Sequence, residues 1–141
     1  MSRLLALDIG DKRIGVAISD ESRLLARPLT TIARASKRED FEAIARLVAA
    51  HNVQRLIVGL PRTLRGEEGR QAQRVRRYVE ALAAAIDAPI AFQDERYTSV
   101  EAEERLAGSS RKPRARRDID AAAAAIILQD YLDQQRKVLD N

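Results

Sequence analysis

Residues 4–20 constrain the fold more than any other stretch of this chain. An apolar run ends in one carboxylate, Asp8, a turn over residues 10–12 follows, and a second apolar run over residues 14–18 returns. Turn residues between two runs rich in β-branched side chains predict a β-hairpin. An acid at the end of a buried strand is costly unless it is paired or binds a metal. The alternative is that Asp8 only closes the turn, where Asp is common.

Composition limits the classes of protein and of site that remain. With 141 residues, of which 45% are hydrophobic and 33% charged, the chain suits one globular domain spanning residues 1–141. The absence of cysteine excludes disulfides and zinc-thiolate sites, and the single histidine, His51, excludes a site with several histidines from one chain. The net charge of +4 permits a polyanionic partner without requiring one.

No targeting or membrane-spanning segment is expected. Asp8 interrupts the first apolar stretch too early for a signal peptide, and no apolar run approaches the length that crosses a bilayer. We therefore expect a cytoplasmic protein with no membrane partner.

The rest of the chain alternates between strand and helix patterns. A third strand over residues 24–33 contains Pro28, which cannot donate to a ladder and so predicts a sheet edge. Ser36 opens a capping box before a helix over residues 37–51, and the apolar run at 56–60 suits a buried central strand. The further expected elements are a loop at 62–70, helices at 67–87 and 98–108, a strand at 90–93, a mobile basic segment at 109–117, and a final helix from about Asp118 that frays after about 133.

This order of elements predicts an α/β fold. The first three strands can form an antiparallel meander, whereas the later strands follow helical crossovers and so pair in parallel. We expect a mixed five-stranded sheet with helices on both faces.

Acidic residues recur where these elements end or begin. Asp8 ends the first strand, Asp94 and Glu95 end the last strand, and Asp118 and Asp120 open the final helix. Strand ends of such sheets gather ligands, and only one of two adjacent strand residues can face a given side. Converging carboxylates need a cation, and hard oxygen ligands favour Mg²⁺ or Mn²⁺, which fits phosphodiester hydrolysis. The alternative is that these acids are separate turn and cap residues.

Four groups of residues resemble the YqgF/RuvX family, relatives of the RuvC resolvase in the ribonuclease H-like superfamily. They span nearly the whole chain in the family's order. The matching pieces are residues 7–10 with 12–17; residues 58–61 with Gly66, 68–69 and 71–72; residues 94–96 with Thr98 and Glu101; and Asp120 with Ala122, Ala124, 126–128 and 131–132.

This resemblance implies a ribonuclease H-like nuclease whose Asp8, Glu95 and Asp120 are catalytic and hold metal, as two Mg²⁺ or Mn²⁺ ions. Asp118, at a variable position of the family pattern, is the expected helix cap, and it is a reserve ligand together with Asp94. The residues that we expect to contact nucleic acid are Lys12, Arg13, Arg65, Arg70, Arg96, Arg114, Arg116 and Arg117. Arg70, Arg74 and Arg77 also form a stripe on one helix, which is more simply read as a solvated face.

The resemblance leaves two substrates open: four-way DNA junctions and the 5′ end of precursor 16S ribosomal RNA. A homodimer is also compatible with it. Two readings from other classes remain, an ATP-binding domain of the actin-like or sugar-kinase type and a nucleic-acid-binding protein without activity. The first lacks a second domain and a later glycine-rich phosphate loop in this sequence.

Overall fold

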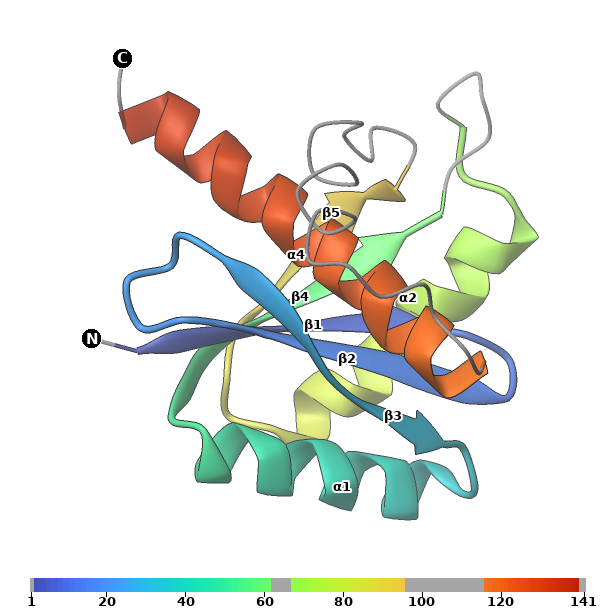
Figure 1. Ribbon diagram of the computed structural model, residues 1–141. Helices are drawn as coiled ribbons and strands as arrows, with labels where there is room; N and C mark the ends of the chain where they lie inside the picture. The colour runs from blue at the N-terminus through green and yellow to red at the C-terminus, as the bar shows by residue number, and fades with distance from the viewer. Residues whose placement is uncertain (1, 62–66, 96–115, 140–141) are drawn as a thin grey trace.

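A computed structural model describes residues 2–61, 67–95 and 116–139, with the side chains of residues 118–138 in the last segment (Figure 1). Its sheet has five strands in the order β3-β2-β1-β4-β5. The elements are β1 (Arg3–Ile9), β2 (Arg13–Ser19), β3 (Ala26–Ala33), α1 (Lys37–Ala50), β4 (Val53–Leu60), α2 (Arg70–Ala85), β5 (Ile90–Asp94) and α4 (Arg116–Leu139).

The sheet is mixed, as the element order predicts. β1, β2 and β3 form an antiparallel meander, and β4 pairs in parallel with both β1 and β5. In the hairpin the Gly10 amide donates to the Arg13 carbonyl at 2.9 Å. A Cβ on Gly10 would stand 2.8 Å from that carbonyl oxygen, so only glycine leaves room for the turn. The tight turn places Asp8 opposite Gly15 in the register.

The expected edge strand and capped helix are both confirmed. β3 lies at one edge of the sheet, and its pairing with β2 shifts register next to the position of Pro28. Ser36 is the N-cap of α1, and its hydroxyl accepts from the Glu39 amide at 3.1 Å. The apolar run at 56–60 belongs to β4, which begins earlier, at Val53.

The helices cover the sheet from both sides, as Figure 1 shows. Alternate strand residues such as Leu5, Leu7 and Ile9 form one core with α1 and α2. The intervening residues, such as Leu4 and Ala6, form a second core with α4. Because side chains alternate along a strand, Asp8 projects toward α4 whereas its neighbour Ile9 packs on the α1 and α2 side.

Several predicted boundaries differ from the structure. α2 begins at Arg70 rather than at residue 67, with Gly69 as its N-cap. α4 begins at Arg116, so residues 116–117, expected in the mobile basic segment, are helical. α4 also continues to Leu139, past the expected fraying point. Pairs one turn apart accompany this extension, including Gln134 to Asp130 at 3.1 Å and an ion pair between Arg136 and Asp133.

The predicted helix at 98–108 and the predicted basic segment up to residue 115 lie outside the described residues. No described helix combines the length and the apolar character that crossing a bilayer requires.

Candidate active site

Asp8 lies at the end of β1 with its carboxylate on the side of the sheet that α4 covers. The side chain is half-buried. Its partner across the hairpin is Gly15, which has no side chain of its own to fill the space. This end of β1 is therefore open to groups that arrive from β5 and from α4.

Glu95 reaches Asp8 because β4 has a glycine between them. A Cβ on Gly59 would stand 2.4 Å from Glu95 Oε1 and 2.6 Å from Ile127 Cδ1. The Glu95 carboxyl donates a hydrogen bond to the Asp8 carboxylate. Burial, then the charge of Asp8 and this hydrogen bond, raise the pKa of Glu95 to about 8. Glu95 therefore holds a proton near neutral pH that it would give up to a cation.

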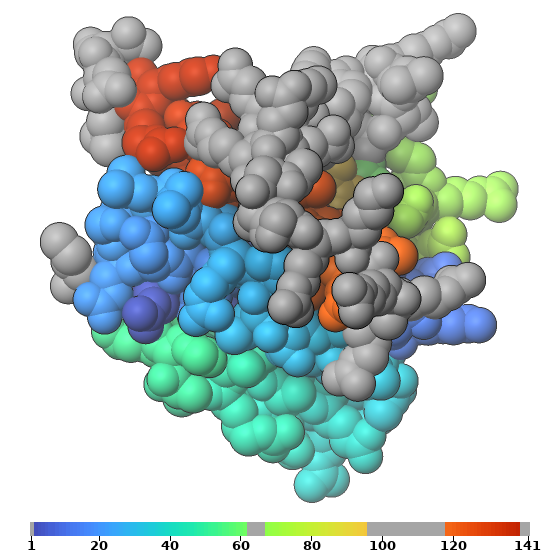
Figure 2. Space-filling model, in the orientation of Figure 1, coloured from blue at the N-terminus to red at the C-terminus, as the bar shows by residue number. Residues whose placement is uncertain are grey.

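Asp120 enters the site from α4, which packs very closely on β2. A Cβ on Gly15 would stand 1.9 Å from the backbone oxygen of Asp120, so glycine is required for this approach. Figure 2 shows the start of α4, in orange, beside the blue β1–β2 hairpin. Arg13 Nε donates to Asp120 Oδ2 at 2.7 Å. Burial, and further the charge of Asp120, raise the pKa of Asp8.

Three acids from distant parts of the chain are thus brought to one end of the sheet. Their donor set consists of hard carboxylate oxygens, which suits Mg²⁺ or Mn²⁺. The described residues hold no group of three acidic, histidine or cysteine side chains drawn together as ligands of one ion. Instead, the protonated carboxyl of Glu95 donates to Asp8, and Arg13 forms an ion pair with Asp120. Both contacts offset like-charge repulsion that a divalent cation would also relieve, so the residues fit such an ion.

The two reserve acids do not join this group. Asp118 lies in the first turn of α4 and is exposed. The expectation that it is the N-cap is wrong, because the helix begins two residues earlier, at Arg116. Its charge instead faces the positive end of the helix dipole. Asp94 is the last residue of β5, directly before Glu95, and alternation turns it to the opposite side of the sheet, although its charge still raises the pKa of Glu95.

The expected nucleic-acid contacts divide into three groups. Lys12 and Arg70 are exposed, at the hairpin turn and at the start of α2. Arg13 lies in the acidic site as the partner of Asp120, a long-range pairing that sequence reasoning missed. Arg65, Arg96 and Arg114 lie outside the described residues, and of Arg116 and Arg117 only the helical backbone is described.

A group of basic side chains, which sequence reasoning missed, surrounds the same hairpin turn. Arg34 NH1 donates to the Gly10 carbonyl at 2.8 Å. Lys37 and two arginines of α2, Arg74 and Arg77, line the adjoining pocket. The only signal in the sequence was the arginine stripe of this helix, which resembles an ordinary solvated face.

Comparisons with known proteins agree with this fold. Over residues 2–134 the chain matches the family described as "RuvX: Holliday junction resolvase". A protein of Chloroflexus aggregans, named "Putative pre-16S rRNA nuclease", is 51% identical over 134 residues, with 94% of each chain covered. A protein of Thermoanaerobacter pseudethanolicus with the same name is 48% identical, with 95% of this chain and 98% of that protein covered.

Two solved structures resemble this chain in fold at low sequence identity. The RuvC of T. thermophilus in complex with a Holliday junction substrate superposes with a TM-score of 0.67 at 15% identity, covering 96% of each chain. The fowlpox virus resolvase with Holliday junction DNA gives a TM-score of 0.56 at 12% identity, covering 94% of this chain and 98% of that one. By its sequence, the chain belongs to the RuvX family.

Proposed function

We propose that this protein hydrolyses phosphodiester bonds of structured nucleic acid with a divalent metal, at the site formed by Asp8, Glu95 and Asp120. Membership of the RuvX family makes the chain a nuclease. The observation that carries the choice of site is the convergence of three acids from the end of β1, the residue after β5 and the start of α4. Burial, together with the neighbouring carboxylates, raises the pKa of Asp8 and Glu95 there. Perturbed carboxyl groups gathered at strand ends are a mark of functional sites.

The three carboxylates would hold one or two Mg²⁺ or Mn²⁺ ions. When bound, such ions activate a water and stabilise the leaving oxygen of the scissile phosphate. The chain's own residues supply the ligands and the balancing positive charge. With a cation bound, Glu95 would act as a ligand without its proton, and Arg13, which balances the charge of Asp120 in this structure, would no longer be needed for that purpose. Arg13 is then free to contact a phosphate of the substrate, which is the role expected for it from the sequence.

The first candidate substrate is precursor 16S ribosomal RNA, because relatives about half identical over nearly the whole chain are named for it. A four-way DNA junction is the second candidate, favoured by the family description and by the junction-bound structural neighbours. Because both candidate substrates are nucleic acids of the cell interior, we infer a cytoplasmic location.

The test compares cleavage of the two substrates side by side in Mg²⁺, Mn²⁺, Ca²⁺ and chelator. We expect cleavage of at least one substrate with Mg²⁺ or Mn²⁺, and none in chelator. Ca²⁺ should support little cleavage, because its loose coordination positions water and phosphate poorly. Full activity in chelator would remove the metal mechanism, and cleavage of neither substrate under any condition would remove the proposed function.

Substitution of the acids tests the assignment of the site. Asp8→Asn, Glu95→Gln and Asp120→Asn each remove a ligand charge while keeping the shape, so cleavage should be abolished. Substrate affinity in chelator should be retained, because basic side chains supply most binding to the phosphate backbone. Asp118→Asn is the matched control, with activity near wild type and a loss of stability below about 1 kcal/mol from the helix dipole. Normal cleavage by two of the three variants would show that the site is elsewhere.

A further inference from the structure

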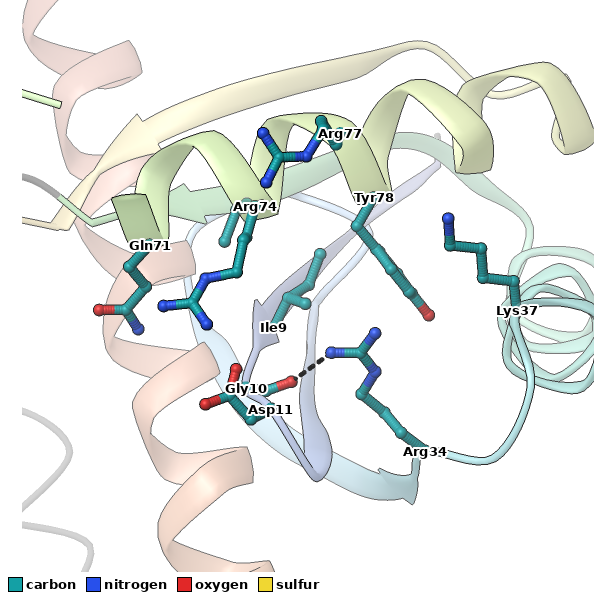
Figure 3. Close-up of a pocket in the computed structure, with 10 residues that line it drawn as sticks. Ile9, Gly10, Asp11, Arg34, Lys37, Gln71, Arg74, Arg77 and Tyr78 are labelled. Carbon is teal, nitrogen blue, oxygen red and sulfur yellow. Dashed lines mark hydrogen bonds between the residues drawn. The ribbon is translucent and has the colours of Figure 1, made fainter. Parts of the chain in front are cut away.

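A pocket lies on the opposite side of the β1–β2 turn from the carboxylates. Its volume is about 320 Å³, and it lies between the hairpin turn, the end of β3, the start of α1 and the first turns of α2. Figure 3 shows Arg74 extending from α2 toward Gly10 and Asp11, with Arg34 reaching the same turn from the other side. Side chains from three separate segments therefore surround one cavity.

The pocket is strongly basic. Four cations line it, Arg34, Lys37, Arg74 and Arg77, against a single acidic lining residue, Asp11. Within the described parts of the chain, Lys37, Arg74 and Arg77 have no ion-pair partner. Basic side chains that line one pocket without acidic partners give it a positive potential, so the pocket favours an anion.

Arg34 is held in place at the base of this pocket. Its NH1 donates to the Gly10 carbonyl at 2.8 Å, and its Nε lies 3.7 Å from Asp40 Oδ2. Its Cζ stands 4.5 Å from the centre of the Tyr78 ring. Asp40 is buried and also accepts from the Tyr78 hydroxyl at 2.9 Å. The guanidinium is thus fixed by three groups while its NH2 has no acceptor among the described residues, which preorganises a donor for a ligand.

The hairpin turn connects this pocket to the carboxylate site. Gly10, whose carbonyl accepts from Arg34, follows Asp8 by two residues. The turn residues are also held by Arg34 N, which donates to the Lys12 carbonyl at 2.9 Å. A phosphate held here would lie beside the reaction centre but across the end of β1 from it. It would therefore be a phosphate other than the one being cut.

We propose that this pocket binds a backbone phosphate of the nucleic-acid substrate and anchors a second stretch of strand beside the cleavage site. This inference rests on the proposed nuclease function and specifies how a branched or folded substrate is held. Arg34 supplies the fixed contact, and Lys37, Arg74 and Arg77 supply further positive charge. Phosphate contacts position a nucleic acid without reading its sequence, so the pocket selects shape rather than bases.

The test measures binding in a Lys37→Ala/Arg74→Ala double variant, leaving the Arg34 network intact. The control is Arg27→Ala/Arg46→Ala, which removes the same charge from two exposed arginines outside the pocket. Affinity for a four-way junction and for a precursor 16S fragment is measured by fluorescence anisotropy in chelator over a range of salt. We expect about a tenfold loss for the pocket variant and a slope of log affinity against log salt flatter by about two units on duplex DNA. The control should keep the wild-type slope.

Two further arms separate the explanations. A Lys37→Arg/Arg74→Lys variant keeps the charge and should restore binding, whereas loss in this variant as well would indicate a structural defect. Calorimetry with inorganic phosphate and with ATP should give no tight binding, and tight binding of either would assign the pocket to a small phosphate ligand instead.

In cleavage assays with Mg²⁺ or Mn²⁺ the pocket variant should show a higher KM and an unchanged kcat. Failure of wild-type cleavage would overturn the proposed function alone, and an unchanged salt slope in the pocket variant would overturn the anchoring site alone.

Discussion

At the scale of single residues, Gly59 decides whether Glu95 can reach Asp8. A Cβ at this position would overlap Glu95 Oε1 at 2.4 Å and Ile127 Cδ1 at 2.6 Å, both below any ordinary contact. We predict that Gly59→Ala displaces the Glu95 carboxyl, abolishes most cleavage and destabilises the fold by about 1–3 kcal/mol through overpacking. Cleavage rates and urea denaturation of the same preparation measure both effects.

Gly69 provides the comparison for this substitution. A Cβ there meets nothing within 4 Å, although Gly69 is the N-cap of α2. Gly69→Ala should therefore keep activity near wild type with a small change in stability. Wild-type cleavage by Gly59→Ala would mean that the position of Glu95 beside Asp8 does not matter for the reaction.

At the scale of whole elements, local patterns predicted the strands and the first two helices, but not the limits of α4. The hairpin and α1 carry their own signals, a turn and the Ser36 cap. The alanine-rich start of α4 has no comparable signal, so Asp118 was mistaken for its cap. The convergence of Asp8, Glu95 and Asp120 could be anticipated from strand order. The pairing of Arg13 with Asp120 could not, because it depends on the close packing of α4 on β2 at Gly15, which no local pattern indicates.

One buried side chain of α4 fixes this helix to the sheet edge. Gln129 Oε1 accepts from the Ala26 amide at 2.9 Å, and its Nε2 donates to the Leu24 carbonyl at 3.0 Å. We predict that Gln129→Leu costs about 1–3 kcal/mol, because it leaves a buried amide unsatisfied. Gln135→Leu is the control, since Gln135 is exposed on the same helix and its loss should cost under about 0.5 kcal/mol. Equal midpoints of urea unfolding for the two variants would contradict this role of Gln129.

At the scale of the whole molecule, the carboxylate site lowers the free energy of unfolding at neutral pH. The pKa of Glu95 rises from an ordinary 4.5 to about 8 in the folded protein, mainly through burial and the charge of Asp8. Between these values the folded chain keeps a proton that the unfolded chain releases. Stability in chelator is therefore greatest below the unfolded pKa and falls as the pH rises through this window, with the loss complete above the folded pKa. A group that lowers stability in this way fits a role in chemistry better than a role in folding.

A bound cation should reverse this dependence. Because Mg²⁺ or Mn²⁺ competes with the proton for Glu95, the stabilisation that it provides should grow from pH 6 to about pH 8.5. We predict that the melting temperature in chelator falls over this range more in the wild type than in Glu95→Gln, and that saturating Mn²⁺ recovers it in the wild type alone. Titrating groups that do not contact Glu95 cancel in the difference between the two proteins, so differential scanning fluorimetry across pH reports on the Asp8–Glu95 pair. Parallel curves for the two proteins, with and without Mn²⁺, would show that Glu95 neither holds this proton nor binds the metal.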